Sequence, residues 1–462
     1  MGIETEYGLM CASTEGGTPP LDPEETAAEL FRAVLESGLS TNAFLANGAR
    51  LYLDVGAHPE YATAECRTVA DLVAHDRAGE LLFAGMAAEA NERLAARGVP
   101  GRIHLFKNNL DAAGNSYGCH ENYLVRRRPD YRARISTMLP FFVTRQIVAG
   151  AGCLRRGEDG VTRFAFSQRA DQMWDAVSSA TTRARPLINT RDEPHADAER
   201  YRRMHVIVGD SNVAQGSTLL KVAAMDLLLD YLESGGDLSD LTLADPIRAI
   251  RDTCHDLSGG ALLELSDGRT MTALEMQAEH LDRLRNHVAG DLEVTELHAA
   301  ALDLWERGLQ AVRLQQPELV ATELDWAAKH QLVTRYCQLH GTDLTDPRVT
   351  RLTLAYHDVS PEQGLRQRLE NAGMLRRFVD DEACRRAIDT PPATTRAHLR
   401  GAVVARAEDL RRDLTVDWVS LRLDDGASPT VTLSDPFCAA DERVDALLEN
   451  MEHSATDLPA GV

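Results

Sequence analysis

Acidic side chains alternate with other residues near the start of the sequence, in Gly2-Ile-Glu-Thr-Glu-Tyr-Gly8. Successive side chains of a β-strand point to opposite faces, so Glu4 and Glu6 would share one face of a strand. Same-face neighbours lie about 7 Å apart, and two carboxylates at that spacing repel each other. Water or a hard divalent cation over the pair relieves this repulsion. The segment is therefore either a solvated edge strand or one side of a metal site.

A second alternating segment, Arg50-Leu-Tyr-Leu-Asp-Val55, has the period of a half-buried strand. Arg50, Tyr52 and Asp54 would share its polar face. A cation, a phenol and a carboxylate on one face fit either a solvated sheet surface or the floor of a polar site. The two glutamates of the first segment favour the polar site.

Two further strands carry candidate ligands. In the strand expected at 119–125, Glu121 shares a face with Tyr123, and the residues alone indicate a surface glutamate beside a core tyrosine. In residues 201–209, Arg203 and His205 lie opposite a face of methionine and valine side chains. On the polar face of the same sheet, Arg203 and His205 could bind a metal or a phosphate.

Longer blocks of sequence surround these segments and run in the same order along nearly the whole chain. They include Asn47-Gly-Ala-Arg-Leu-Tyr-Leu-Asp54, His58-Pro-Glu-Tyr-Ala-Thr-Ala-Glu-Cys66, Phe106-Lys-Asn-Asn109, Gly114-Asn-Ser-Tyr-Gly-Cys-His-Glu-Asn-Tyr123, Ser178-Ser-Ala-Thr-Thr-Arg183, Ile188-Asn-Thr-Arg-Asp-Glu-Pro-His-Ala-Asp197, His205-Val-Ile-Val-Gly-Asp210 and Thr415-Val-Asp-Trp418. Together with the first eight residues, these blocks resemble the Pup ligases. That family belongs to the carboxylate-amine ligases and is related to glutamine synthetase.

The resemblance implies an α+β fold. We expect a large glutamine-synthetase-like domain over residues 1–392, with a curved, mostly antiparallel sheet backed by helices. A small C-terminal α+β domain would follow over residues 393–462.

The resemblance also implies an activity, the ATP-dependent joining of a carboxylate to an amine. The carboxylate would be the side chain of the C-terminal glutamate of Pup, the prokaryotic ubiquitin-like protein. The amine would be a lysine of a target protein, and the product would be linked to degradation by the proteasome. Carboxylate attack on the γ-phosphate would give a γ-glutamyl phosphate, from which the amine displaces phosphate. ATP and Mg²⁺ are the implied cofactors.

Individual residues match the positions of the family's site. Glu4, Glu6, Tyr52 and Glu60 resemble its metal-site positions, and analogy with glutamine synthetase adds Glu121 and His205.

Arg50 resembles the arginine that contacts ATP, and Thr63 lies where a further contact with the nucleotide is expected. Trp418 could stack on the adenine or be a core residue of the small domain, and Arg203 is a candidate for phosphate. Asp54 matches the catalytic aspartate, which would accept the proton of the lysine ammonium group.

Three other functional interpretations are consistent with part of these sequence blocks. The sister enzyme of the family, the Pup deamidase and depupylase, has the same fold but a long extra loop before the Arg-x-Tyr-x-Asp strand, whereas only 43 residues separate Glu6 from Arg50 here. A small-molecule ligase resembling glutamine synthetase would lack the blocks at 178–197. A non-catalytic Pup-binding or proteasome-binding protein would have lost the glutamates or Asp54.

The composition excludes several classes of partner. With 49 basic and 71 acidic residues, the formal net charge is -22. This argues against nucleic acid and against anionic membrane surfaces, both of which require a basic face. The eight cysteines include no Cys-x-x-Cys pair, and no apolar leader precedes the first strand, so we expect reduced thiols in the cytoplasm.

Helices and turns must position the polar strands. Asp22-Pro-Glu-Glu25 has the residues of a helix start, and Gly38 could end that helix. A second helix is expected at about 70–97, and a mainly helical region runs from about 216 to 385. Within that region the pattern predicts helices at about 272–289, 293–313 and 316–339. A connector at 389–396, a helix to about 412 and a strand over Thr415–Leu421 complete the prediction.

Overall fold

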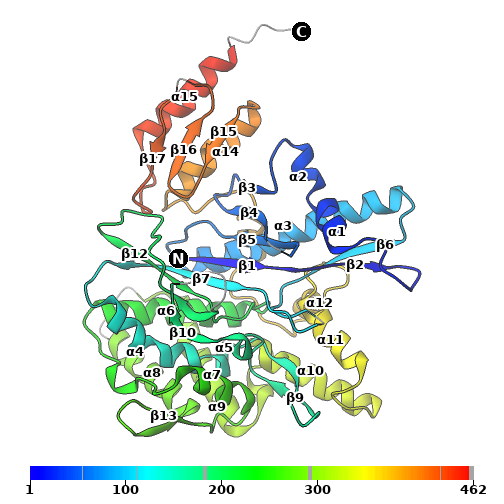
Figure 1. Ribbon diagram of the computed structural model, residues 1–462, viewed down its shortest axis with the longest axis vertical. Helices are drawn as coiled ribbons and strands as arrows, with labels where there is room; N and C mark the ends of the chain where they lie inside the picture. Colours follow the sequence, from blue (N-terminus) through cyan, green and yellow to red (C-terminus); the bar gives the residue numbers. More distant parts are fainter. Residues whose placement is uncertain (55, 112, 180–184, 290–293, 427, 457–462) are drawn as a thin grey trace.

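The computed structural model describes residues 1–54, 56–111, 113–179, 185–289, 294–426 and 428–456. Its centre is a sheet of eight strands in the order β10-β11-β12-β7-β1-β5-β4-β3 (Figure 1). All neighbours pair antiparallel except β10 and β11. The strands are β1 (Gly2–Glu6), β3 (Asn42–Phe44), β4 (Arg50–Asp54), β5 (His58–Ala62), β7 (Cys119–Arg126), β10 (Asp175–Ser178), β11 (Pro186–Asn189) and β12 (Tyr201–Val206).

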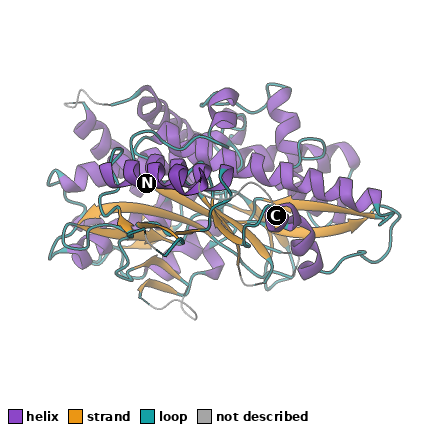
Figure 2. Cartoon of the chain, turned by 90° about the horizontal axis from the view of Figure 1, so that it is seen from above, coloured by secondary structure: helices purple, strands orange, loops and turns teal. Residues whose placement is uncertain are grey.

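Most of the helices lie on one side of this sheet (Figure 2). They bury one face of the strands in a large apolar cluster that includes Ile3, Tyr123 and Val206. The expected α+β fold, with a mostly antiparallel sheet backed by helices, is confirmed. The helices are α1 (Pro23–Leu30), α2 (Arg32–Glu36), α3 (Val69–Ala96), α4 (Tyr131–Thr144), α5 (Gln146–Ala149), α6 (Gln215–Glu233), α7 (Pro246–His255), α8 (Ala273–Val288), α9 (Glu296–Leu314), α10 (Asp325–His340), α11 (Pro347–His357), α12 (Leu365–Asn371) and α13 (Asp381–Arg386).

Within the described ranges, three two-stranded antiparallel sheets lie outside the central sheet. They pair β2 (Gly8–Ser13) with β6 (Gly101–Phe106), β8 (Cys153–Arg156) with β9 (Thr162–Ala165), and β13 (Leu262–Glu264) with β14 (Thr270–Thr272).

The first helix begins as its sequence predicts but is divided. The Asp22 carboxylate accepts a hydrogen bond from the Glu25 backbone N–H at 2.8 Å, and the Glu25 side chain accepts one from the Asp22 N–H at 3.0 Å. This reciprocal capping satisfies backbone donors that a helix start leaves unpaired. The helix is interrupted at Phe31, which separates α1 from α2, and Gly38 with φ 90° follows α2.

Two elements differ from the prediction. The helix expected at 316–339 begins only at Asp325, because Gln315 adopts φ 54° at the end of α9 and a short 3-10 turn at Pro317–Leu319 follows. The strand expected over Thr415–Leu421 is two strands, β15 (Leu414–Val416) and β16 (Ser420–Leu423). The Asp417 carboxylate accepts the backbone N–H groups of residues 419 and 420, and this turn interrupts the extended chain.

The C-terminal region forms a small α+β unit at one end of the molecule (Figure 1). It contains α14 (Ala397–Asp409), the three strands β15, β16 and β17 (Val431–Thr432), and α15 (Glu442–Thr456). Its buried apolar side chains, among them Val403, Leu421 and Leu447, form a cluster of their own. The division of the chain at residue 392 remains a prediction.

The helices of the described ranges were compared with the requirements for crossing a membrane. Within the described ranges, none combines the length and the apolar character that crossing a bilayer requires.

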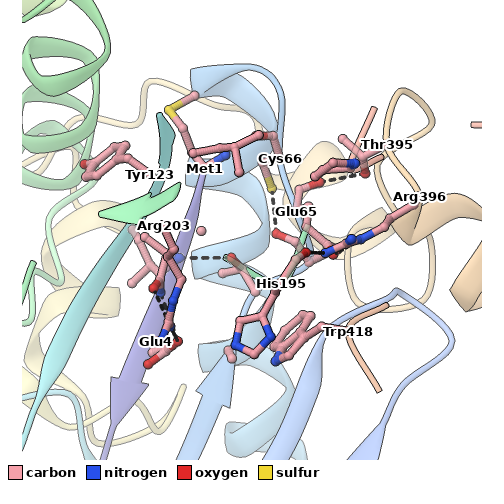
Figure 3. Close-up of a pocket in the computed structure, with 18 of the residues that line it drawn as sticks. Met1, Glu4, Glu65, Cys66, Tyr123, His195, Arg203, Thr395, Arg396 and Trp418 are labelled. Carbon is pink, nitrogen blue, oxygen red and sulfur yellow. Dashed lines mark hydrogen bonds and ion pairs between the residues drawn. The ribbon is translucent and has the colours of Figure 1, made fainter. Parts of the chain in front are cut away.

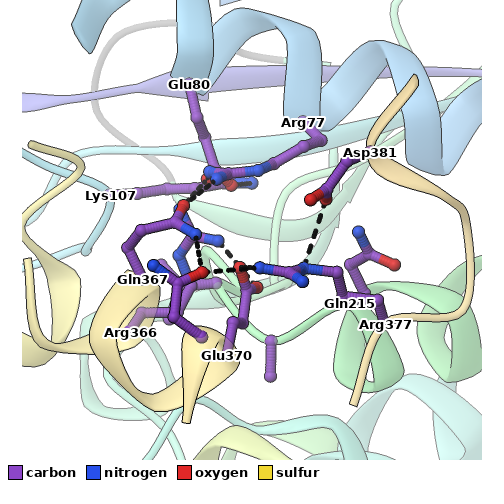
Figure 4. A network of polar contacts seen from close by, with 12 residues as sticks. Arg77, Glu80, Lys107, Gln215, Arg366, Gln367, Glu370, Arg377 and Asp381 are labelled. Atoms are coloured by element: carbon purple, nitrogen blue, oxygen red, sulfur yellow. Dashed lines mark hydrogen bonds and ion pairs between the residues drawn. The ribbon is translucent and has the colours of Figure 1, made fainter. Parts of the chain in front are cut away.

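A buried network of charges joins the long helix α3 to α12 (Figure 4). The Lys107 Nζ donates to Asp76 Oδ2 at 2.6 Å and to Glu80 Oε1 at 2.9 Å. Arg366 lies 3.1 Å from Glu80 and 2.8 Å from Glu370. The Lys107 and Glu80 side chains are only 1% and 2% exposed. Glu80 on α3 is therefore compensated by Lys107, which follows β6, and by Arg366 on α12.

We predict that Lys107→Met destabilises the fold by about 3–5 kcal/mol, because it leaves two carboxylates with fewer counter-charges in a buried site. Urea unfolding followed by circular dichroism measures the change. The matched control is Arg102→Met, since the Arg102–Glu362 pair is largely exposed and should contribute less than about 1 kcal/mol. Equal effects of the two substitutions would contradict the structural role of the network.

Candidate functional site

One face of the central sheet gathers polar side chains from neighbouring strands. Glu6 on β1 lies opposite Glu60 on β5, and Glu60 lies opposite Tyr52 on β4. Glu4 lies opposite His120 on β7. Directly opposed residues of antiparallel strands point to the same face with Cβ atoms about 5 Å apart. The register therefore brings these side chains together on the face away from the apolar cluster.

The first group on this face is purely acidic. Glu6, Asp54 and Glu60 each bring one carboxylate oxygen to within 4.8 Å of the others. Burial raises the pKa of Glu60 well above its usual value, and the charges of Glu4 and Glu6 raise it further. Burial and nearby carboxylates also raise the pKa of Tyr52, so its side chain stays a neutral phenol. A set of oxygen donors under mutual repulsion suits Mg²⁺.

A second group combines Glu4 with two histidines, His120 and His205, again within 4.8 Å of one another. His205 Nδ1 lies 2.8 Å from Asn122 Oδ1, which also accepts from Arg203. Nδ1 therefore carries the proton, and Nε2 presents its lone pair. Burial and the neighbouring His120 lower the pKa of His205 to about 3. A neutral imidazole held in this way is ready to bind a metal.

Glu4 differs from Glu60 in its surroundings. Its Oε1 accepts a hydrogen bond from Asn122 Nδ2 at 2.9 Å, and Arg203 lies 3.7 Å away. Burial alone would raise the pKa of Glu4, but His120, His205 and Arg203 together lower it. Glu4 is therefore ionised and available to a cation.

The structure does not bring Glu121, predicted as a metal ligand by analogy, to the polar face. Its side chain is fully buried on the opposite face of β7. Arg145 Nη1 donates to Glu121 Oε2 at 3.0 Å, and the Tyr123 hydroxyl donates to the same oxygen at 2.8 Å. Glu121 is thus the counter-charge of a buried arginine. Alternation along β7 places His120 on the polar face in its stead.

The four predicted nucleotide contacts lie toward the C-terminal unit. Thr63, Arg203 and Trp418 line a cavity of about 110 Å³ (Figure 3). Arg50 lines a larger cleft of about 1470 Å³, which also contains Trp418. The Thr63 Oγ1 accepts a hydrogen bond from the Ile3 backbone N–H at 3.1 Å, so the hydroxyl is already engaged within the sheet. The assignment of all four residues to a nucleotide remains a prediction.

Trp418 lies in the turn between β15 and β16. Its ring and the Phe44 ring form a T-shaped pair, with centroids 5.0 Å apart and planes at 86°. The His195 ring lies 6.5 Å away, and both residues line the two cavities. The position of Trp418 between two cavities agrees with a surface for stacking better than with a core residue.

Several residues around the site were not anticipated from the sequence. His120 could have been found, because Cys119, Tyr123 and Val125 are apolar and mark the other face of β7 as the buried one. Glu65 and its buried partners Arg396 and Arg400 come from distant parts of the chain, and local periodicity carries no signal for such contacts. Burial would raise the pKa of Glu65, but Arg400 and Arg396 lower it to about 2.

The arrangement suits chemistry on an anionic substrate. Two groups of metal-binding side chains could hold divalent cations, which would offset the negative charge of phosphates. Arg50 and Arg203 supply guanidinium donors that match phosphate oxygens. Asp54, half-buried at the end of β4, offers a carboxylate that could accept a proton beside them.

Comparison with known proteins gives one consistent result. The family model described as Pup-ligase protein matches residues 1–422. A Pup–protein ligase of Arthrobacter sp. (strain FB24) is 53% identical over 450 residues, which cover 97% of this chain and 98% of the relative. A Pup–protein ligase of Sanguibacter keddieii is 52% identical over 450 residues, with the same coverage.

Two solved structures are also similar. The complex between the prokaryotic ubiquitin-like protein Pup and its ligase PafA matches with a TM-score of 0.93 and 42% identity, over 98% of this chain and 91% of that one. The Pup ligase PafA in complex with ADP matches with a TM-score of 0.85 and 43% identity, over 95% of each chain.

We expect two divalent cations on the polar face, one at each group. Titration of the purified chain with Mn²⁺, followed by electron paramagnetic resonance, should give two ions per chain. His205→Asn should remove the ion at the histidine group, and Glu60→Gln the ion at the acidic group. The exposed His255 is the matched control, and His255→Asn should leave both ions. Retention of two ions by both site variants would contradict the assignment.

Proposed function

The chain belongs to the Pup-ligase family, and from this premise we propose that it joins the C-terminal glutamate of Pup to lysine side chains of target proteins at the expense of ATP. The observation that carries the proposal is the family match over residues 1–422, which includes every predicted site residue. The modified proteins would be directed to the proteasome, as the family resemblance implies.

The reaction has two steps. The side-chain carboxylate of the glutamate of Pup attacks the γ-phosphate of ATP, which gives an acyl phosphate and ADP. The lysine nitrogen then forms an isopeptide bond with the acyl carbon as the bond to phosphate breaks. Both steps bring negative charge onto a sheet face that is already acidic, and so they require cations there.

The polar face supplies places for those cations. Mg²⁺, when bound, would offset the charge of the phosphates during transfer. The oxygen donors of Glu6, Glu60 and Tyr52 fit that ion, with Tyr52 acting as a neutral oxygen or through water. Glu4 and the two histidines would hold a second ion.

The remaining site residues would position the reactants. Arg50 and Arg203 would bind phosphate oxygens, while Thr63 and Trp418 would lie against the nucleoside. A lysine ammonium group, with a reference pKa of about 10.4, must lose a proton before its nitrogen can attack. Asp54 would accept that proton, and its place beside Glu6 and Glu60 puts it next to the proposed metal site.

The runner-up is removal of Pup by hydrolysis. The short connection between Glu6 and Arg50 and the ligase names of the relatives favour ligation. Incubation of the chain with ATP, Mg²⁺, Pup ending in glutamate and a lysine-bearing target distinguishes the two. Mass spectrometry should find the target heavier by one Pup, with ADP formed. Loss of Pup from a preformed conjugate, without ligation, would establish the hydrolase instead.

We predict that Asp54→Asn lowers the rate of ligation by about 10²–10⁴-fold, the range for loss of a general base, while the Kd for ATP stays within about twofold. Single-turnover conjugation and calorimetric titration of ATP measure the two quantities. Asp267→Asn, on the exposed β13–β14 hairpin, is the control and should leave both unchanged. An Asp54→Asn variant that ligates at the normal rate would exclude Asp54 as the base.

A further inference from the structure

Five side chains form a column that runs from the proposed metal site to the C-terminal unit. The guanidinium carbon of Arg50 lies 4.8 Å from the ring centre of Tyr52 and 5.8 Å from that of Phe44. That of Arg400 lies 5.2 Å from Phe44 and 5.0 Å from Trp418. Cations and rings therefore alternate, and cation–π attraction stabilises each contact. The column connects a proposed metal ligand with a proposed nucleoside contact.

Arg400 is the buried cation of this column, with a side chain only 1% exposed. Its Nη2 donates to the Gly48 carbonyl at 2.7 Å, and its Nη1 donates to the Trp418 carbonyl at 3.1 Å. Both terminal nitrogens also donate to the Glu65 carboxylate. One guanidinium thus holds the β3–β4 loop, Glu65 in the segment between β5 and α3, and the turn of Trp418.

Glu65 is fixed in turn by a second arginine (Figure 3). Arg396 Nε donates to Glu65 Oε1 at 2.7 Å, and its other nitrogens donate to the carbonyls of Leu433 at 2.8 Å and His195 at 2.6 Å. The Thr395 hydroxyl donates to the Glu65 carbonyl at 2.7 Å. Glu65 is therefore held by residues 395–400, at the start of the C-terminal unit.

A buried ion pair often stabilises a fold no more than apolar residues of the same volume would. A guanidinium, however, fixes the orientation of the groups around it, because its donors lie in one plane and each must meet its acceptor. We propose that Arg400 is a positioning residue that holds the Trp418 indole at the nucleoside end of the polar face. This rests on the proposed function, in which Trp418 contacts the nucleoside of ATP.

Arg400 would affect the binding of the nucleoside of ATP and not the binding of its phosphates. Arg400 contacts the indole itself, with its guanidinium carbon 5.0 Å from the ring centre, and also holds the Trp418 carbonyl. The phosphates would be held by Arg50, Arg203 and the metals, none of which Arg400 contacts directly. Loss of Arg400 should therefore weaken binding of the nucleoside and spare binding of the phosphate chain.

The test uses the full chain with Arg400→Met. We expect the KM for ATP to rise about tenfold, the size of one lost stacking or cation–π contact, with kcat within about twofold. The inhibition constant of magnesium tripolyphosphate, which has phosphates and no base, should not change. Arg406→Met is the control, because Arg406 lies on the same helix and pairs with Glu452 at the surface.

A double-mutant cycle shows whether Arg400 acts through Trp418. In a Trp418→Ala background, Arg400→Met should have no further effect on the KM for ATP. If Arg400→Met fails to fold, Arg400→Lys replaces it in the cycle, since lysine keeps the charge but has one nitrogen where Arg400 donates from three. An unchanged KM, or equal weakening of ATP and tripolyphosphate, overturns the proposal. Absence of conjugation by the unmodified chain would instead overturn the proposed function.

A separate observation concerns the lysines of the chain itself. The sequence contains 46 arginines and only three lysines. Lys107, Lys221 and Lys329 are 1%, 3% and 2% exposed. Lys107 meets the two carboxylates described above, Lys221 Nζ donates to the Asp210 carbonyl at 2.9 Å, and Lys329 Nζ lies 2.7 Å from His357 Nε2. The permanently charged basic side chains on the surface are thus arginines.

An arginine keeps its proton at neutral pH, so its nitrogen does not attack an acyl phosphate as a lysine amine does. We infer, again on the basis of the proposed function, that the folded chain is not a substrate of its own reaction. Its surface offers no lysine ε-amino group to the active site of a second copy.

Lysines placed at exposed arginines test this inference. Arg126 and Arg248 are 76% and 80% exposed. With ATP, Mg²⁺ and Pup, the unmodified chain should gain no Pup on a lysine, while Arg126→Lys or Arg248→Lys should gain one at the new residue. The controls are Arg126→Gln and Arg248→Gln. Pup on a native lysine overturns the inference, as does failure of both lysine variants while an added target is modified.

Discussion

The repulsion among carboxylates on one face of an antiparallel sheet is the constraint on which the rest of this structure depends. Glu4 and Glu60 lie on adjacent strands, yet their pKa values shift in opposite directions. Glu4 has His120 and Arg203 as neighbours, whereas Glu60 has other acids. The sheet face therefore carries one carboxylate, Glu4, that is already ionised, and another, Glu60, whose ionisation a nearby cation would favour.

Such a face must be held rigidly, because a small shift of one strand would change which charges meet. The register of β1, β5 and β4 fixes the spacing along the sheet. Buried ions fix the surrounding elements, with Lys107 and Glu80 on the helix side and Arg400 and Glu65 at the junction with the C-terminal unit. These contacts have defined directions, which apolar packing does not provide.

The sequence alone predicts the structure correctly where a repeat of two residues determines which side chains share a face. In residues 2–8 the alternation alone determines that the two glutamates share a face. In the strand of Glu121 both faces carry polar groups, and the apolar neighbours, not the acidic residue, decide which face is buried. The sequence around Asp417 has the pattern of a strand. The structure has a turn there, because the Asp417 carboxylate accepts two backbone N–H groups that a strand would pair differently. Contacts such as that of Lys107 join distant segments and leave no local pattern.

Because the three lysines are buried, their reactivity toward solvent reagents also reports local opening of the fold. Reagents that acylate amines should pass over these side chains in the native state and label them only when the surrounding structure opens. Lys107 follows β6 and pairs with α3, Lys221 lies on α6 and Lys329 on α10, so each reports on a different part of the fold. The order in which they become labelled would rank the stability of these parts without any introduced dye or substitution.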